Sequence, residues 1–372
     1  MMVQLVQLMI LAANVSEALP QILLFEDGIW RDVSLQAIPQ KLGDIQNEIE
    51  QHLSRIMRQV GGTPSVSVQA QSPGFKAPFR ALFKTLLPPD VRDALEKAAA
   101  TGGKPVLQLF IAPAVEWIPW ELLHDGTDFL GIRFAVARLP IVKPQTSVRG
   151  DRHRDVPEVQ SLLGDHVLDD ELRAQWELTF EGFCAKPAWE RRFPSNGVAQ
   201  YPTLTEFEEA KRAGVLHVTC HGGLSEQGVG GFFWSLNHTH AQTFNYRITT
   251  SFAETINFAT RPLVFGNACA SVNTNPGALH GFGSSFMIGG ALNFIGTMAP
   301  ISKKMGVLFA RQFYRELFAS HPDGPVSVAE ALRTTKNNFS SPQPPEEPAG
   351  DPSYLFYCLY GPPDATYTPV QG

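Results

Sequence analysis

Short, nearly continuous apolar runs recur along the chain and predict strands that are buried on both faces of a sheet. The runs read "VLQLFIA", "VLHVTC", "LVFGNAC", "ALNFIGT" and "YLFYCLYG". Amphipathic segments before and between them predict helices, among them "PPDVRDALEKAAATGG" and a segment with an apolar stripe at Phe309, Phe313 and Leu317. This alternation predicts an α/β fold in which a mainly parallel sheet is sandwiched by helices.

The first 75 residues follow a different pattern. The opening "MMVQLVQLMILAA" predicts a buried strand, with a signal peptide as the alternative, and "ILLFEDGIWRDVSLQ" predicts two strands around the turn Asp27-Gly28. An amphipathic helix is predicted from the apolar stripe at Leu42, Ile45, Ile49, Leu53 and Ile56. The polar, breaker-rich stretch 61–74 then predicts a boundary. We therefore expect a small α+β N-terminal region of unknown role over residues 1–75 and a larger domain over residues 76–366. The charged stretch 141–160 and the Pro-rich stretch 340–352 predict loops.

Composition narrows the functional classes. The chain is 44% hydrophobic and 18% charged, which is typical of a globular protein, and its net charge of −6 offers no general attraction to nucleic acid or an anionic membrane. The four cysteines, Cys184, Cys220, Cys269 and Cys358, lie far apart and lack the paired spacing of a zinc site. We expect reduced thiols, a cytoplasmic location, and neither a metal nor a cofactor.

Two of the predicted strands end in chemically reactive residues. "VLHVTC" continues into His221-Gly222-Gly223, and "LVFGNAC" ends at Cys269. Sites in open α/β sheets form at the carboxyl ends of strands, so neighbouring strands would bring His221 beside Cys269. The histidine can keep the cysteine as a thiolate, or take its proton during attack, and it can later protonate the leaving amine. The amides of Gly222 and Cys269 can hold the oxyanion. These residues predict a Cys-His dyad.

Several segments resemble the CHAT family of caspase-like cysteine peptidases, found mainly in bacteria. The segments are "WIPWELLHDGTDFLGIRFAVAR", "VLHVTCHGG", "LVFGNACAS", "GFGSSFMIGGALNFIGTMAPIS", "SVAEALRTTKNNF" and "YLFYCLYGPPD". The resemblance covers about residues 78–365 and implies a caspase-like fold over 76–366, with His221 and Cys269 as the dyad of a cysteine endopeptidase. It also implies a protein substrate, an activating sensor or regulator protein, and a setting in defence or programmed cell death.

Position 267, two residues before the cysteine, is expected to contact the substrate. In relatives that cut after Arg or Lys an acid stands there, whereas Asn267 is neutral, which predicts no strong basic preference. Lys303-Lys304 also depart from the family, since many members carry an acid after the strand "ALNFIGT".

Other interpretations remain beside the peptidase. The same fold can serve as an inactive scaffold or interaction module, or the same dyad can catalyse acyl transfer. His217 lies inside a strand, so we interpret it as a hydrogen-bonded core histidine, and Cys220 as a small buried hydrophobe. Trp120 and Glu121 in "PWELL" are interpreted as structural.

Overall fold

A computed structural model provides the structure of the protein. It describes residues 4–11, 21–33, 51, 70, 72–101, 103–112, 115–141, 151–156, 159–164, 171, 174–175, 179, 213–224, 232–236, 247–269, 281–319, 322, 324–341 and 351–370. The predicted apolar stripe from Leu42 to Ile56, most of the predicted boundary 61–74, most of the predicted loop 340–352 and Cys184 lie outside the described residues.

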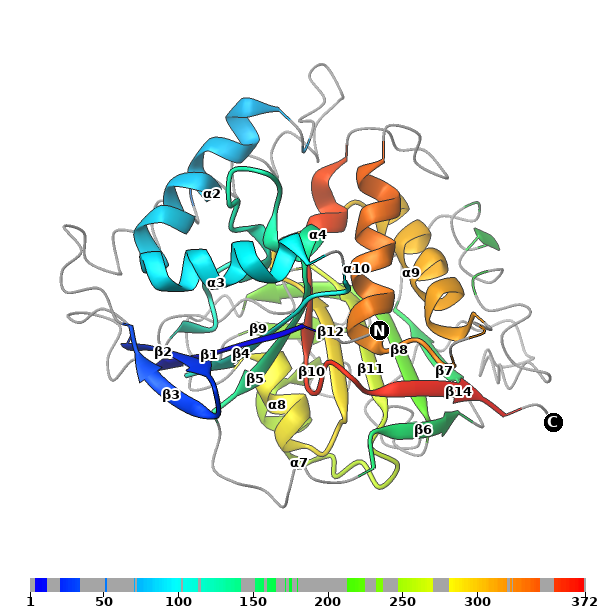
Figure 1. Cartoon of the computed structure of the whole chain (residues 1–372). Helices are drawn as coiled ribbons and strands as arrows, with labels where there is room; N and C mark the ends of the chain where they lie inside the picture. The colour runs from blue at the N-terminus through cyan, green and yellow to red at the C-terminus, as the bar shows by residue number, and fades with distance from the viewer. Residues whose placement is uncertain are drawn as a thin grey trace, which may run out of the picture.

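Within the described residues, twelve strands form one mixed sheet (Figure 1). In spatial order they are β10 (Arg247–Thr249), β9 (Phe232–Ser235), β8 (Val215–Leu224), β11 (Leu263–Ala268), β12 (Asn293–Thr297), β13 (Tyr357–Tyr360), β5 (Ala135–Pro140), β4 (Val106–Ile111), β1 (Leu5–Leu11), β2 (Gln21–Glu26) and β3 (Ile29–Asp32), with β7 (Val159–Leu163) paired to β8 off this path.

The sheet consists of two parallel blocks that run in opposite directions. Strands β7, β8, β11 and β12 are parallel to one another, and so are β13, β5, β4 and β1. The blocks meet at the antiparallel pair β12–β13, and antiparallel pairs extend the sheet at both ends. The predicted α/β fold with a mainly parallel sheet is confirmed. Only Tyr357–Tyr360 of the run "YLFYCLYG" is strand, because Pro352–Phe356 forms a short 3-10 helix, η5.

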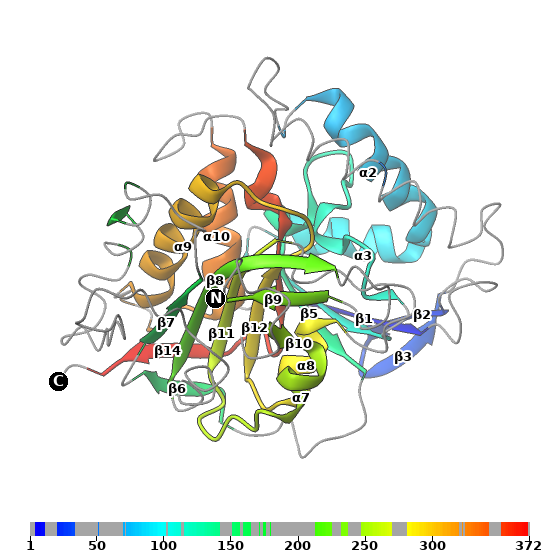
Figure 2. The ribbon, with the colours of Figure 1, turned by 180° about the vertical axis from the view of Figure 1, so that it is seen from behind.

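Helices cover both faces of the sheet. Figures 1 and 2 show α9 (Lys303–Phe318) and α10 (Val328–Ser340) on one side and α7 (Thr250–Thr255) and α8 (Phe282–Ile288) on the other. On the side of α9 lie also α2 (Pro73–Leu86) and α3 (Pro89–Ala100), while α4 (Leu130–Arg133) and the 3-10 helix η2 (Trp120–Leu122) precede β5. None of the described helices is long and apolar enough to cross a membrane.

The N-terminal strands are part of the central sheet. Strand β1 pairs in parallel with β4, from Leu5 opposite Val106 to Ile10 opposite Ile111, which confirms the predicted strand, although only alternate residues of it are buried. Strands β2 and β3 form the predicted hairpin, and both turn residues between them have left-handed backbone angles (φ 52° and 83°) that suit a two-residue hairpin turn. The start of the chain therefore shares its hydrogen bonding with the region that begins at residue 76.

The predicted loop over residues 141–160 is wrong for part of that range. Strand β6 (His153–Val156) pairs in parallel with β14 (Thr366–Pro369) in a separate two-stranded sheet, and β7 begins at Val159. His153 and Asp155 are exposed while Val156 is buried. Charged residues on the solvent face of a short edge strand hide its alternation, which explains the wrong prediction.

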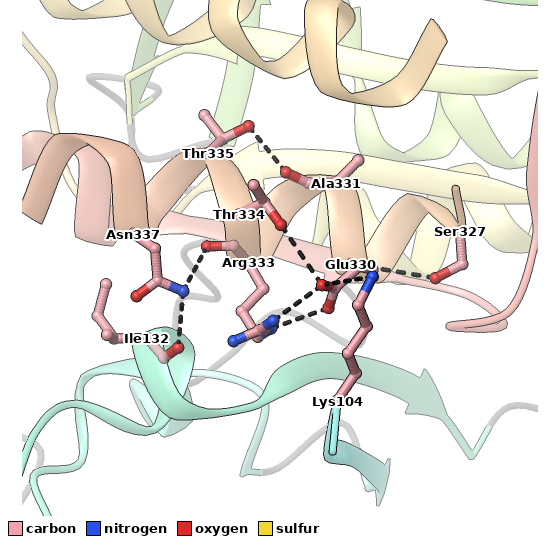
Figure 3. A network of polar contacts seen from close by, with 9 residues as sticks. All are labelled: Lys104, Ile132, Ser327, Glu330, Ala331, Arg333, Thr334, Thr335 and Asn337. Carbon is pink, nitrogen blue, oxygen red and sulfur yellow. Dashed lines mark hydrogen bonds and ion pairs between the residues drawn. The ribbon is translucent and has the colours of Figure 1, made fainter. Parts of the chain in front are cut away.

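A polar network joins α10 to the rest of the molecule (Figure 3). Glu330 accepts two hydrogen bonds of 2.8 Å from the Arg333 guanidinium and lies 3.4 Å from Nζ of Lys104. The Asn337 amide donates to the carbonyl oxygen of Ile132 at 3.1 Å. Burial alone would raise the pKa of Glu330, but the charges of Arg333 and Lys104 outweigh it and lower that pKa. The network fixes α10 against α4 and the start of β4.

Candidate active site

The strands that carry the two candidate catalytic residues are direct neighbours. Strands β8 and β11 pair in parallel up to Cys220 opposite Ala268. His221 follows Cys220 directly, and Cys269 follows Ala268 directly. Figure 2 shows β8 continuing past this point alongside β9. The structure therefore places His221 and Cys269 side by side where the β8–β11 ladder ends. Strand β8 itself continues to Leu224 and pairs with β9 from His221 on, so the expectation that this strand ends before His221 is wrong.

Both candidate residues belong to the sheet face that α9 covers. Four residues earlier on the same strands, His217 stacks on Phe265 with ring centroids 4.9 Å apart. Side chains alternate between faces, so a step of four residues keeps His221 and Cys269 on that face. Sγ of Cys269 lies 4.0 Å from the carbonyl oxygen of Ile301, two residues before α9 begins.

Gly222 packs against the backbone of Cys269. A Cβ added at residue 222 would lie 2.2 Å from the Cys269 carbonyl oxygen, closer than a Cβ and an oxygen ever approach. Glycine is therefore required here by contact rather than by backbone angles. The close approach fixes the distance between the two strand ends, and the predicted oxyanion amides of Gly222 and Cys269 come from the same junction.

The Cys269 thiol differs from the other described thiols in its exposure. Cys220 and Cys358 are buried, whereas Cys269 is half-buried. Burial raises the pKa of all three thiols, that of Cys220 well above its ordinary value. A raised pKa favours a neutral Cys269 thiol at rest and removal of its proton during attack. A thiolate that persists in the resting enzyme would require a lowered pKa of Cys269 instead.

His217 is placed as the sequence suggested. It is buried, with Nδ1 3.0 Å from the Tyr314 hydroxyl oxygen and Nε2 2.9 Å from the Thr219 hydroxyl oxygen. Burial lowers the pKa of His217 to about 3, so the ring is neutral. A neutral, fully packed imidazole agrees with a core histidine.

Asn267 lies below Cys269, almost fully covered by α9. Its side chain is 5% exposed, accepts a 2.9 Å hydrogen bond from the Tyr357 hydroxyl and lies under Gly306 of α9. Its role in substrate binding stays a prediction.

A buried arginine ties the "PWELL" segment to the sheet, and sequence reasoning missed it. Arg138 is 1% exposed, and its Nε donates to one Glu121 carboxylate oxygen at 2.9 Å. Its two terminal nitrogens donate to the other Glu121 carboxylate oxygen, to the carbonyl oxygens of Glu116 and Ile118, and to the Tyr360 hydroxyl. Burial alone would raise the pKa of Glu121, but Arg138 outweighs it and lowers that pKa. The arginine inside the apolar run "FAVARLP" could have indicated this ion pair, because a charge in a buried strand requires a partner of opposite charge.

A second buried carboxyl, also missed, lies at the start of α8. Glu116 accepts hydrogen bonds from the Ser284 hydroxyl and, at 3.3 Å, from the backbone N–H of Gly281. Burial raises the pKa of Glu116 to about 7, although the Gly281 hydrogen bond and the charge of Arg138 act in the opposite direction. Glu116 therefore joins the segment before η2 to the helix that follows residues 270–280.

The protonation of Glu116 is expected to make stability depend on pH. A folded pKa above the unfolded one means that the contribution is complete in acid and is lost as pH rises through about 7. Glu116→Gln stays neutral, so the free energy of unfolding of the variant minus that of the wild type should increase by on the order of 3 kcal/mol from pH 5 to pH 8. Urea unfolding of both proteins across this range measures the difference, and a difference that stays constant with pH would contradict the assignment.

No group of three or more His, Cys, Asp or Glu residues that could hold a metal ion occurs in the part of the chain that the structure describes.

Comparisons with known proteins place this chain in a family. The model of the CHAT domain matches residues 76–355, which is 280 of 372 residues, and no curated protein matches the chain. Among solved structures, the Saccharomyces cerevisiae separase–securin complex is similar at 13% identity and a TM-score of 0.42, over 88% of this chain and 23% of that chain. The complex of Porphyromonas gingivalis RgpB pro- and mature domains is similar at 12% identity and a TM-score of 0.48, over 87% of this chain and 77% of that chain.

The chain thus spans about a quarter of the separase chain that it matches. The family match covers the segment with β8, β11 and both candidate residues. The chain belongs to the CHAT domain family.

Proposed function

We propose that the protein is a cysteine endopeptidase in which Cys269 is the nucleophile and His221 the general base. The observation that supports this most is the junction of β8 and β11, where the two residues follow the last registered pair and Gly222 abuts the Cys269 carbonyl. Cys269 is more exposed than Cys220 and Cys358, which are buried, and this also fits a reactive thiol.

The raised pKa of Cys269 favours a mechanism in which the proton moves during attack. His221 takes the thiol proton while Sγ forms a bond to the substrate carbonyl carbon, and the oxyanion faces the amides of Gly222 and Cys269. Collapse of this intermediate breaks the C–N bond, and the imidazolium returns its proton to the leaving amine. Water then hydrolyses the thioester, again with His221 as base.

The proposal extends to the setting of the enzyme. Membership of the CHAT family supports a cytoplasmic peptidase that acts on a protein substrate and is controlled by a sensor or regulator protein. A role in bacterial defence or cell death is part of the same proposal. Asn267 is proposed to contribute to a substrate pocket without a strong preference for Arg or Lys.

Cleavage of a proteome-derived peptide library tests the proposal. Mass spectrometry should detect new N-termini with the wild-type chain, and Cys269→Ala and His221→Ala should each lower their yield by about 1000-fold or more. Cys220→Ala is the matched control, since a buried strand thiol contributes packing only and should leave the yield within a few-fold.

Three outcomes would contradict the proposal. Cleavage that survives in Cys269→Ala, or that disappears only in Cys220→Ala, would show that another residue is the nucleophile. Absence of new N-termini with the wild-type chain would favour an inactive scaffold. Products joined by a new amide bond in place of hydrolysis would favour acyl transfer.

A further inference from the structure

Helix α2 has an outer face on which every charged residue is a cation. Its sequence contains Lys76, Arg80 and Lys84 and neither Asp nor Glu. Arg80 and Lys84 are exposed and Lys76 is half-buried. The side chains on the opposite side of the helix are buried, namely Phe75, Phe79, Leu82, Phe83 and Leu86. Figures 1 and 2 show α2 on the outside of the molecule, with no described helix or strand over its outer face.

The three cations form a regular row along the helix. Lys76, Arg80 and Lys84 recur at every fourth residue, and residues four apart are neighbours on a helix surface. A rise of about 1.5 Å per residue places successive cations about 6 Å apart along the axis. Ala77 and Ala81 are exposed beside this cationic row and have short side chains. A second helix can therefore approach the row closely.

The cationic row has no counter-charge within the described part of the chain. None of its three side chains forms an ion pair or a hydrogen bond there. Like charges four residues apart destabilise a helix, and the helix dipole disfavours a cation in the first turn, where Lys76 lies. The next helix, α3, carries both acidic and basic residues. A local cost without an internal compensation indicates a role toward another molecule.

The positive charge of the row also acts on the loop beside α2. The backbone N–H of His124 donates to the carbonyl oxygen of Phe79 at 3.3 Å, so this loop lies against the helix. Burial lowers the pKa of His124, and the charges of Lys76 and Arg80 lower it further, although Asp128 acts in the opposite direction. The nearby acid thus leaves the positive charge of the row uncompensated at His124.

We propose that the cationic row of α2 is a docking surface for an acidic helix of a partner protein. Carboxylates at every fourth residue of such a helix have the same spacing of about 6 Å, so they can pair with all three cations. A chain with a net charge of −6 repels a polyanion such as RNA more strongly than a short helix with three carboxylates, which favours a protein partner. The surface is distinct from the candidate dyad, and the inference does not depend on peptidase activity.

Fluorescence anisotropy with synthetic peptides tests the proposal. The matched peptide is an alanine-rich helix of about 20 residues, long enough to be helical, with glutamate at every fourth residue. A second peptide has the same number of glutamates at every fifth residue, which distributes them around the helix, and a third has glutamine in their place. The full chain carries Cys269→Ala throughout, so that no peptide is cut. At an ionic strength of about 0.02 M the matched peptide should bind about 5-fold or more tightly than the second peptide, and the third should not bind.

A row variant and a control variant locate the binding site. The row variant combines Lys76→Gln, Arg80→Gln and Lys84→Gln. The control variant makes the same change of net charge at three exposed positions outside α2, with Lys97→Gln, Lys304→Gln and Arg315→Gln. The row variant should bind the matched peptide about 10-fold or more weakly, and the control variant should stay within about twofold. Thermal unfolding should show that the row variant is at least as stable as the parent chain, because repulsion within α2 is removed.

Four results would overturn the proposal. An unchanged affinity in the row variant, or an equal loss in the control variant, would show that the row does not bind the peptide. Equal affinities for the two glutamate peptides would show that helical spacing is not recognised. Single-stranded RNA of about 20 nucleotides that binds more tightly than the matched peptide, and is released by the row variant, would assign the surface to nucleic acid. A dimer of the parent chain that the row variant abolishes in analytical ultracentrifugation would assign it to a second copy.

Discussion

Gly222→Ala is expected to reduce peptidase activity by about 100-fold or more in a protein that still folds. The new Cβ would lie 2.2 Å from the Cys269 carbonyl oxygen, and neither partner is a flexible side-chain end, so the end of β8 or Cys269 itself must move. A displacement of about 1 Å at a catalytic pair is enough for a loss of this size. Activity on the peptide library and the free energy of unfolding should be measured together.

Gly74→Ala is the matched control for this substitution. Gly74 lies in the first turn of α2, where an added Cβ would have nothing within 4 Å, so activity should be unchanged. The overpacking at Gly222 should cost about 1–3 kcal/mol of stability, which a domain of this size can tolerate. Full activity in Gly222→Ala would show that the junction of β8 and β11 does not position the reacting groups.

The strands could be predicted from sequence where both of their faces are buried. β4, β11, β12 and residues 215–220 of β8 are buried at nearly every position, because helices cover the sheet on both sides, and the sequence runs that contain them are mostly apolar. The same reasoning failed for Pro352–Phe356, since a buried 3-10 helix produces an equally apolar run. It failed again for β6, where one face is exposed and charged.

The candidate dyad could be predicted because each residue directly follows a recognisable apolar run. The apolar runs place His221 and Cys269 at strand ends, but the neighbour relation of β8 and β11 is a tertiary property that a linear pattern does not contain. The partners of Glu116 and Arg138 were missed for the same reason. Gly281 is 165 residues from Glu116, so only the fold brings them together.

Arg138→Met is expected to lower the free energy of unfolding by about 3–5 kcal/mol, the largest stability effect of any substitution considered. The change removes the cation that is hydrogen-bonded to the buried Glu121 carboxylate, and it takes the Arg138 donors away from the Glu116 and Ile118 carbonyls. Arg138→Lys should recover little, because a single ammonium cannot replace a planar group with five N–H donors. Urea unfolding measures each variant.

A double-mutant cycle separates the ion pair from loss of packing. Arg138→Met combined with Glu121→Leu removes both charges, so the double variant should be more stable than the sum of the single effects predicts, by about 2 kcal/mol or more. The exposed pair Arg31–Glu26 is the matched control, at 2.8 Å with side chains 53% and 46% exposed, and Arg31→Met should cost less than about 1 kcal/mol. Additive effects at Arg138 and Glu121 would mean that the arginine stabilises the fold by packing alone. If Arg138→Met leaves a buried carboxylate without its counter-charge, removing that carboxylate with Glu121→Leu recovers part of the lost stability.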